Sequence, residues 1–263
     1  MTTVQDVLDY IQEEVAPTYM KEDWDRVGLL CGRHDRPVRK ILVALDAFAV
    51  VCREAAEAEA DLLVTHHPVL WKCEEVNDGT ATGRNLLFLI EHGIAAINAH
   101  TNLDCAPGGV NDCLAAALGL QQVQVLNPLG TDGLDRPYGL LRQGCLPSQN
   151  LETFLSRVKE GLGCPHLRYS SAARPVESVA VGGGSCAGEL EAVSAAGCDT
   201  FVTADVKYNR FADAQELGVN LVDAGHFWTE NPVCASLARR LQVRFPDVRV
   251  KLSKNHTDCI KFF

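Results

Sequence analysis

Two segments of similar pattern lie 138 positions apart in this chain, and this repeat restricts the folds that the sequence can adopt. Ile41–Asp46 (ILVALD) aligns with Val179–Gly184 (VAVGGG), and each is a short apolar run that ends in a turn. Asp61–Thr65 (DLLVT) aligns with Asp199–Thr203 (DTFVT), after which the two copies diverge. Similarity at a fixed separation is typical of repeated supersecondary units, although two ordinary strand–helix–strand units can also match over so short a length. We expect two related lobes.

Short apolar runs alternate with amphipathic segments along the whole chain. The expected strands are apolar throughout, which is typical of a sheet covered by helices on both faces. The sequence therefore predicts an α/β fold of two related α/β lobes, an internal duplication, with a metal site between them. The first lobe is expected over residues 1–125 and the second over residues 126–263, with a C-terminal strand that is able to pack on the first lobe.

Local signals place the individual elements. Strands are expected at 41–45, 62–65, 94–98, 138–146, 167–170, 179–181, 200–203 and 220–222, and helices at 3–15, 49–60, 85–92, 110–118, 148–159, 188–196, 209–217 and 228–241. Thr2 or Thr3 is the expected cap of the first helix, and Ser148 that of the helix at 148–159. Trp24–Gly32 is predicted to be a turn-rich connector. Gln122–Arg136 contains Pro, Gly and Asp without periodicity and is the predicted lobe boundary.

Composition and charge argue against several classes of protein. A net charge of −10 disfavours broad electrostatic binding of nucleic acid or of an anionic membrane. The longest apolar stretches are far too short to span a bilayer, and Met1–Thr3 leads into an acidic amphipathic segment without a signal peptide. The eleven cysteines form no CxxC pair, so we expect reduced thiols. These features predict a globular protein of the cytoplasm.

Two adjacent histidines, His66 and His67, directly follow the expected strand at 62–65. In α/β folds, ligands bind beyond the carboxyl ends of the strands, so this is an expected place for a site. Adjacent side chains on an extended or turning backbone point in different directions. The pair therefore favours two different ions over one chelated ion, whereas the simpler alternative is two ordinary histidines in a surface loop.

Two further histidines are each followed four residues later by a carboxylate, in the pairs His100/Asp104 and His226/Glu230. Both pairs begin where a strand is expected to end. A helix that starts near His226 would place His226 and Glu230 on one face, a spacing that suits a metal ion. The alternative is that Asp104 is a turn or capping residue and that Glu230 stabilises a helix dipole.

All three clusters fall at predicted strand ends, and their joint occurrence favours metal binding over the separate alternatives. Imidazole and carboxylate donors without thiolate fit Fe, Mn, Zn or Co, and five or six ligands favour two divalent transition-metal ions per chain. The turn Gly182–Ser185 (GGGS) has two interpretations, an anion site at a helix start or a tight turn that needs glycine. Cys105 and Cys186 are expected to be packing residues.

At these residues the chain resembles the Nif3-like dinuclear-metal family, whose bacterial members are often labelled GTP cyclohydrolase 1 type 2 homologues. The matching motifs run through nearly the full length in the family's order, and they are WDRVGLLCG (24–32), VTHHPVLW (64–71), INAHTNLDCAPGGVNDCLAAALGL (97–120), VAVGGGS (179–185) and LVDAGHFWTENP (221–232). Three positions depart from the family's common residues, namely Arg26, Ala204 and Asn209. The chain resembles the short form, without a central insertion.

The resemblance implies a ligand set and an assembly. His66 and His67 would bind separate ions, Asp104 would bind one and His226 the other, and Glu230 would bridge both. His100 would lie close to the metals, as an inner or supporting residue or a proton shuttle. The resemblance also implies a toroidal homohexamer, a trimer of dimers.

Two functions from different classes follow. The first is a metal-dependent hydrolase of the GTP cyclohydrolase 1 type 2 kind, in which paired ions activate water against a nucleotide-like small molecule. The second is a non-catalytic metal-binding or regulatory hexamer, in which the metals stabilise the fold. Open coordination positions distinguish a catalytic from a structural site.

Overall fold

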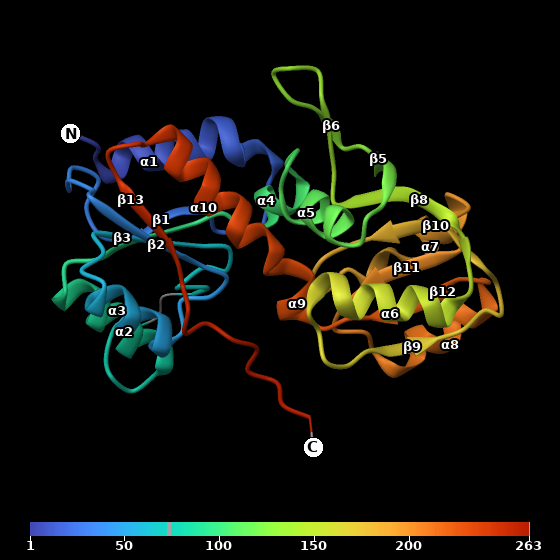
Figure 1. Cartoon of the computed structure of the whole chain (residues 1–263). Coiled ribbons are helices and arrows are strands. Elements are labelled where there is room, and N and C mark those ends of the chain that lie inside the picture. Colours follow the sequence, from blue (N-terminus) through green and yellow to red (C-terminus); the bar gives the residue numbers. More distant parts are fainter. Residues whose placement is uncertain (73–74, 263) are drawn as a thin grey trace. The chain divides into compact units, whose positions relative to one another are not determined.

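The computed structural model of the chain describes residues 1–72 and 75–262 (Figure 1). By packing, these residues form two compact units, the first from residues 1–103 and 234–257 and the second from residues 104–233 and 258–263. The sequence predicted a single division at residue 125, whereas the polypeptide passes between the units three times. Over the described residues, no helix combines the length and the apolarity that a membrane crossing requires.

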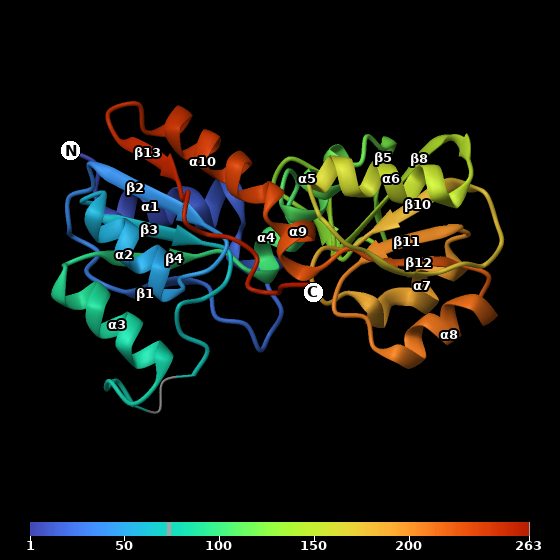
Figure 2. The same ribbon diagram turned by 60° about the horizontal axis from the view of Figure 1, so that its bottom comes forward.

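The first unit is a five-stranded sheet in the order β1-β4-β3-β2-β13, in which all neighbours except β1 and β4 are parallel. Figures 1 and 2 show α2 and α3 on one face of this sheet, with α1 and α10 on the other. Its elements are α1 (Val4–Tyr10), a π-helical turn (Ile11–Val15), a 3-10 turn (Thr18–Met20), β1 (Gly28–Cys31), β2 (Lys40–Ala44), α2 (Ala49–Glu57), β3 (Leu62–Thr65), α3 (Ala81–Glu91), β4 (Ala95–Asn98) and β13 (Arg249–Leu252).

The second unit contains a six-stranded sheet in the order β5-β8-β10-β11-β12-β9, with a parallel centre of β10, β11 and β12. A separate pair, β6 and β7, lies outside it. The elements are α5 (Val110–Ala117), β5 (Gln121–Leu126), β6 (Gly130–Thr131), β7 (Pro137–Tyr138), β8 (Leu141–Gln149), α6 (Leu151–Leu162), β9 (Arg168–Ser170), β10 (Val176–Val181), a 3-10 turn (Ala187–Glu189), α7 (Leu190–Ala195), β11 (Thr200–Thr203), α8 (Tyr208–Glu216), β12 (Asn220–Asp223) and α9 (His226–Glu230). Two helices contain unit boundaries, α4 (Thr101–Cys105) and α10 (Pro232–Arg244).

Both faces of the second sheet are buried, as the unalternated apolar strands predict. One apolar core joins Val179 and Val181 of β10 to α5 and α6, through residues such as Leu114 and Phe154. The other joins Ala180, the residue between those valines, to α7 and α8. Successive side chains of a strand point to opposite faces, so a strand packed on both sides must be apolar at every position. The predicted α/β fold is confirmed.

The segments that repeat in sequence also share their hydrogen-bond register. In the first unit Ile41 is opposite Leu62, and in the second Val179 is opposite Thr200, which are the same pair shifted by 138 positions. A buried aspartate immediately precedes the second strand of each pair. Asp61 Oδ2 accepts the backbone N–H groups of residues 39 and 40, and Asp199 Oδ2 accepts those of residues 177 and 178, at 2.8–3.1 Å. The correspondence therefore extends to the side chain that anchors each strand.

Several local predictions were wrong, two of them at the edge strands β1 and β5 and one at the end of the inner strand β8. The predicted connector Trp24–Gly32 contains the edge strand β1. Gly28 and Gly32 lie at the two ends of this strand, and because glycine is typical of turns the sequence did not predict a strand there. The predicted lobe boundary at 122–136 contains most of β5, a largely exposed edge strand. The strand predicted at 138–146 runs to Gln149, so Asn150 rather than Ser148 caps the next helix, by accepting a hydrogen bond from the N–H of Thr153 at 2.8 Å.

The predictions for the first and last helices are corrected in part. Thr3 caps the first helix, as predicted, in a reciprocal arrangement with Asp6. The helical stretch ends in a π-helical turn, Ile11–Val15. The single helix predicted at 228–241 is divided into α9 and α10, and α10 begins at Pro232. Proline is favourable in the first turn of a helix because it lacks the N–H that would have no partner there.

The two anchoring aspartates give a matched test of the shared architecture. Asp61→Ala and Asp199→Ala should each destabilise the protein by about 1–3 kcal/mol, because each variant removes the acceptor of two partly buried backbone hydrogen bonds. Chemical denaturation measures this, with exposed Asp247→Ala as the control, expected to stay within about 0.5 kcal/mol of the parent. A change of only control size in either aspartate variant would contradict the anchoring role.

Candidate metal centre

In the first unit, three histidines come together beyond the ends of two neighbouring strands. Thr65 at the end of β3 is paired with Asn98 at the end of β4, so His66, His67 and His100 all emerge at one edge of the sheet. One ring nitrogen of each histidine lies within 4.8 Å of those of the other two. We call these three residues the histidine group. His66 and His100 are buried and His67 is partly buried.

Each member of the histidine group has its Nδ1 next to an acceptor. His66 Nδ1 lies 2.9 Å from the carbonyl oxygen of Ala99, and His67 Nδ1 lies 2.7 Å from Asp46 Oδ1. His100 Nδ1 lies 2.9 Å from Asp25 Oδ1. A carbonyl or carboxylate oxygen accepts a hydrogen bond, so the tautomer that fits these contacts has its hydrogen on Nδ1. This is the tautomer that binds a metal through Nε2, with the other nitrogen held by an outer partner.

Asp25 and Asp46 support the histidine group, although sequence reasoning assigned a function to neither. Asp25 also accepts hydrogen bonds from the backbone N–H and the hydroxyl of Thr101, at 3.0 and 2.6 Å. Burial alone would raise the pKa of the Asp25 carboxyl, but the hydrogen bonds from His100 and Thr101 outweigh it and hold that pKa well below its usual range. The signal available in the sequence was the position of this aspartate within the WDR motif.

Asp46 is held from two sides. Its second oxygen, Oδ2, lies 3.0 Å from Nε2 of His256, which follows β13 in the C-terminal part of the unit. Burial would raise the pKa of the Asp46 carboxyl, but hydrogen bonds from His256 and His67 lower it well below its usual range. Asp46 is therefore ionised and fixes the orientation of the His67 ring. It is the last residue of the repeated segment ILVALD, where a carboxylate following a strand was the available signal.

In the second unit, Asp104, His226 and Glu230 form what we call the mixed group. His226 and Glu230 lie one turn apart on α9, which begins at His226, so they share a face as their spacing predicts. His226 Nε2 lies 3.0 Å from Glu230 Oε2, and a carboxylate oxygen of Asp104 lies within 4.8 Å of one of Glu230. Asp104 and Glu230 are both buried. Two buried carboxylates this close repel each other, and the imidazole of His226 is the basic group next to Glu230.

Asp205 supports the mixed group as Asp25 and Asp46 support the histidines. Its Oδ2 lies 2.8 Å from Nδ1 of His226. Burial lowers the pKa of His226, but hydrogen bonds to Asp205 and Glu230 outweigh it and raise that pKa to about 10. Asp205 belongs to the segment in which the chain departs from its resembled family, and the departure at Ala204 leaves this carboxylate in place. Among the residues that the structure describes, no side-chain contact explains the other two departures, Arg26 and Asn209.

Arg142 positions the residues that follow Asp104. Its guanidinium is buried, with 1% of the residue exposed, and donates to the carbonyl oxygens of Cys105 and Ala106 at 3.2 and 3.1 Å. The buried charge is paired with Asp112 at 2.7 Å. Since these contacts fix the end of α4, Arg142 helps to set the direction in which Asp104 points. Its place in a predicted strand gave no indication of this role.

The glycine turn at 182–185 makes room for Glu230. Gly184 has a φ of +64°, and a Cβ built there would lie 2.0 Å from Glu230 Oε1. The N–H groups of Gly183 and Gly184 donate to Asn111 Oδ1 and Thr229 Oγ1, at 2.7 and 3.0 Å. Both N–H groups thus already donate to protein oxygens, which favours the interpretation of this segment as a tight turn over its interpretation as an anion site.

Cys186 is a packing residue next to the mixed group. Burial and the nearby carboxylates of Asp104 and Glu230 raise the pKa of its thiol well above the ordinary value, and the thiol donates to the carbonyl of Gly183 at 3.1 Å. A neutral thiol is a weak nucleophile and a weak metal ligand. This arrangement agrees with the predicted packing role.

Two exposed tryptophans flank the histidine group. Trp24 and Trp71 are 64% and 50% exposed, and their rings are stacked with centroids 6.4 Å apart. The rings of His100 and Trp71 are nearly perpendicular, with centroids 5.0 Å apart. Exposed stacked indoles next to three convergent imidazoles provide a flat apolar surface at the edge of the candidate site.

Substitution of three glycines separates crowding at Glu230 from backbone strain. Gly184→Ala should lower the metal content, because its methyl group would displace the Glu230 carboxylate. Gly197 has a φ of +78° with nothing near the added Cβ, so Gly197→Ala should cost about 1–2 kcal/mol in stability and leave metal content unchanged. Gly188→Ala, with neither feature, should change neither quantity. Elemental analysis and denaturation measure the two effects, and normal metal content in Gly184→Ala would contradict the role of this glycine.

The raised pKa of His226 predicts a pH dependence of the metal-free protein. The folded value of about 10 exceeds the ordinary value of 6.5, so the stability contributed by the charged imidazole is complete below pH 6.5 and is lost as the pH rises towards 10. In chelator-treated protein, His226→Gln should therefore reduce the fall in Tm between pH 7 and 10. His92→Gln, at an exposed helix end, is the control. Equal slopes for both variants and the parent would contradict this coupling.

Comparison with known proteins gives a consistent family. A model of the family Duf34/NIF3 (NGG1p interacting factor 3) matches residues 2–259. A Clostridium perfringens protein named GTP cyclohydrolase 1 type 2 homolog is 32% identical, covering 98% of this chain and 99% of its own length. A protein of the same name from Streptomyces coelicolor is 36% identical, covering 92% and 88%.

Solved structures agree with this. Hypothetical protein SA1388 of Staphylococcus aureus superposes with a TM-score of 0.92 at 28% identity, over 99% of both chains. A Bacillus cereus protein related to NIF3 gives a TM-score of 0.93 at 24% identity, over 100% of this chain and 99% of that one. The resemblance drawn from the motifs is thus confirmed, and the chain belongs to the Duf34/NIF3 family.

Proposed function

We propose that this protein binds two divalent transition-metal ions and uses them to hydrolyse a nucleotide-like small molecule. The observation that carries the proposal is a contact shared by four imidazoles, each of which has its Nδ1 next to a protein acceptor. His66, His67, His100 and His226 are held in this way by one backbone carbonyl and three carboxylates. Outer acceptors of this kind accompany metal-binding histidines in proteins, where they fix the tautomer and raise ligand basicity.

The donor set fits the proposed metals. We propose His66, His67, Asp104, His226 and Glu230 as ligands, with the two oxygens of Glu230 able to serve both ions. The donors are imidazole nitrogen and carboxylate oxygen, which suit Fe, Mn, Zn or Co, while the neutral thiol of Cys186 does not compete. The buried carboxylates of Asp104 and Glu230 also favour a cation, since each would otherwise repel the other.

Bound ions would supply Lewis acidity to the reacting bond and make water more acidic. The chain itself supplies orientation and proton transfer. Asp25 accepts a hydrogen bond from Nδ1 of His100, which makes Nε2 the nitrogen at which His100 would accept a proton as a general base. Asp46 holds the ring of His67 and Asp205 holds that of His226, which keeps these two rings from turning.

Two observations support a nucleotide-like substrate. The exposed faces of Trp24 and Trp71 lie next to His100, and bases stack on aromatic side chains of this kind with about 1–3 kcal/mol of stabilisation per base. The names of the relatives in Clostridium perfringens and Streptomyces coelicolor refer to GTP cyclohydrolase. The acidic chain can bind such an anionic compound if the metals take its phosphates.

Metal content and turnover on a panel of nucleotides test the proposal together. Protein reconstituted with Zn, Mn, Co or Fe should hold about two ions per chain, because five ligands are too many for one four-coordinate ion with an open position. Glu230→Gln should lower the occupancy of both ions, whereas His66→Ala and His67→Ala should each mainly affect one. Exposed His92→Ala is the control and should retain both ions.

Turnover separates the two classes of function. With GTP, GMP and their nucleosides as substrates, His100→Gln should reduce hydrolysis on the order of a hundredfold while leaving most of the metal bound, as for other groups that transfer protons. Metal bound at two ions per chain without turnover on any substrate would favour the non-catalytic metal-binding protein. A reproducible metal content near zero after reconstitution would overturn both.

A further inference from the structure

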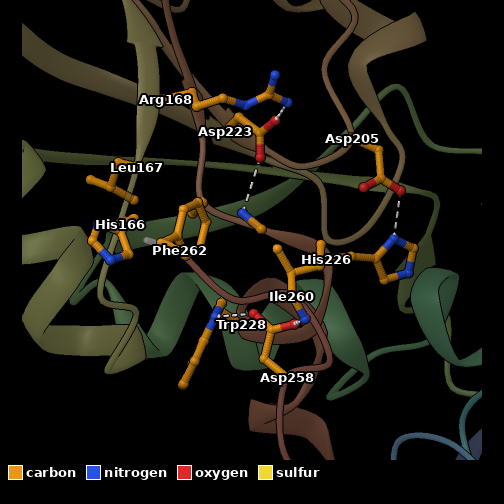
Figure 3. A pocket seen from close by; sticks show the side chains of 12 residues that line it. His166, Leu167, Arg168, Asp205, Asp223, His226, Trp228, Asp258, Ile260 and Phe262 are labelled. Carbon is orange, nitrogen blue, oxygen red and sulfur yellow. Dashed lines mark hydrogen bonds and ion pairs between the residues drawn. The ribbon is translucent and has the colours of Figure 1, made fainter.

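The second unit contains a cavity that the proposed metal ligands do not fill. Its volume is about 210 Å³, and Figure 3 shows the side chains that line it. His226 and Asp205 lie on one side of the cavity, and residues 258–262 of the C-terminal segment lie on another. An apolar cavity of roughly 150 Å³ accommodates a benzene-sized ligand, so this space suits one ring system.

Much of the wall is apolar and aromatic. Leu167 and Ile260 provide aliphatic surface, and the rings of His166 and Phe262 lie with centroids 4.2 Å apart. Trp228 is fixed there because its Nε1 donates to Asp258 Oδ2 at 2.8 Å. Walls of this composition pack well against the faces and edges of a planar ring.

The polar groups of the cavity carry negative charge. Three aspartates, Asp205, Asp223 and Asp258, line it together with a single arginine, Arg168. Arg168 already pairs with Asp223, as the dashed line in Figure 3 shows, and also donates to the carbonyl of Val206 at 3.0 Å. Asp205 lies next to His226 at 2.8 Å, whereas Asp258 accepts hydrogen bonds from the neutral N–H groups of Trp228 and Ile260. The carboxylates of the lining therefore outnumber its cationic groups, so an anionic group would meet excess negative charge, whereas a neutral or cationic ring with N–H groups would meet acceptors.

We propose that this cavity is a second ring site, distinct from the stacking surface of Trp24 and Trp71, and that it binds a planar, neutral or cationic ring with the segment Asp258–Phe262 as one of its walls. Because His226 lines the cavity, the ring would be held beside a proposed metal ligand. The link between this ring and a substrate rests on the proposed function. Binding of an isolated ring rests only on the cavity and needs no metal.

Three fluorinated single-ring or bicyclic probes test the charge preference in the full-length protein. Ligand-observed ¹⁹F NMR should give dissociation constants on the order of a millimolar for 5-fluoroindole and 4-fluorobenzylamine, as expected for ligands this small. Binding of 4-fluorobenzoate should be at least tenfold weaker. Equal or tighter binding of the benzoate, or no binding of any probe at millimolar concentration, would overturn the proposal.

A filled cavity provides the second test. Ile260→Trp should weaken 4-fluorobenzylamine and 5-fluoroindole at least tenfold, because the larger side chain occupies the same space. Ile90→Trp on α3 is matched in residue type and exposure, 57% against 55%, and should leave binding unchanged. An unchanged affinity in Ile260→Trp, measured on protein with the parent's Tm, would refute this site.

The same measurements separate this inference from the metal proposal. Chelator-treated and metal-reconstituted protein should both bind the two probes, because the cavity walls lie in the folded chain. Probe binding together with absence of metal would therefore refute only the metal proposal. Two bound metals together with absence of probe binding would refute only the ring site.

Discussion

The hydrogen-bond register between β3 and β4 determines where the histidine group forms. These parallel strands end opposite one another, at Thr65 and Asn98, and the chain continues from both ends with histidines. A register shift of one residue would reverse the face to which the side chains of a strand point and would disrupt the close packing of β3 and β4, whose residues are all buried. The position of three imidazoles is thus a consequence of core packing.

The second unit repeats this construction with different side chains. Thr203 at the end of β11 is opposite Asp223 at the end of β12, and the backbone bond from Ala224 to Thr203 corresponds to that from Ala99 to Thr65. Where the first unit continues into His66 and His67, the second continues into Ala204 and Asp205. The same backbone arrangement is therefore followed by candidate metal ligands after β3 and by Asp205, which holds His226, after β11.

The sequence was sufficient for the central strands and for the spacing of the candidate ligands. β3 and β11 were predicted at their observed bounds, because buried parallel strands are apolar at every position. The hydrogen bonds that hold the histidine rings were not predictable from the sequence, because their partners are far apart in the chain. Asp25 and His100 are 75 residues apart, and Asp46 and His256 are 210 apart. The edge strands β1 and β5 were also not predicted, because a strand that is only partly buried has a weak hydrophobic pattern in its sequence.

The return of the chain to the first unit affects the order in which the protein can be completed during synthesis. Strand β2 obtains its neighbour β13 only after residue 249 has been made, about 205 residues after Ala44. At about 5–20 residues per second, translation leaves that edge of the growing sheet without its strand for roughly 10–40 s. An unpaired strand edge is prone to join other chains. Residues 104–233, all but the tail of the second unit, are made before then, so that unit can fold while the first still awaits its last strand.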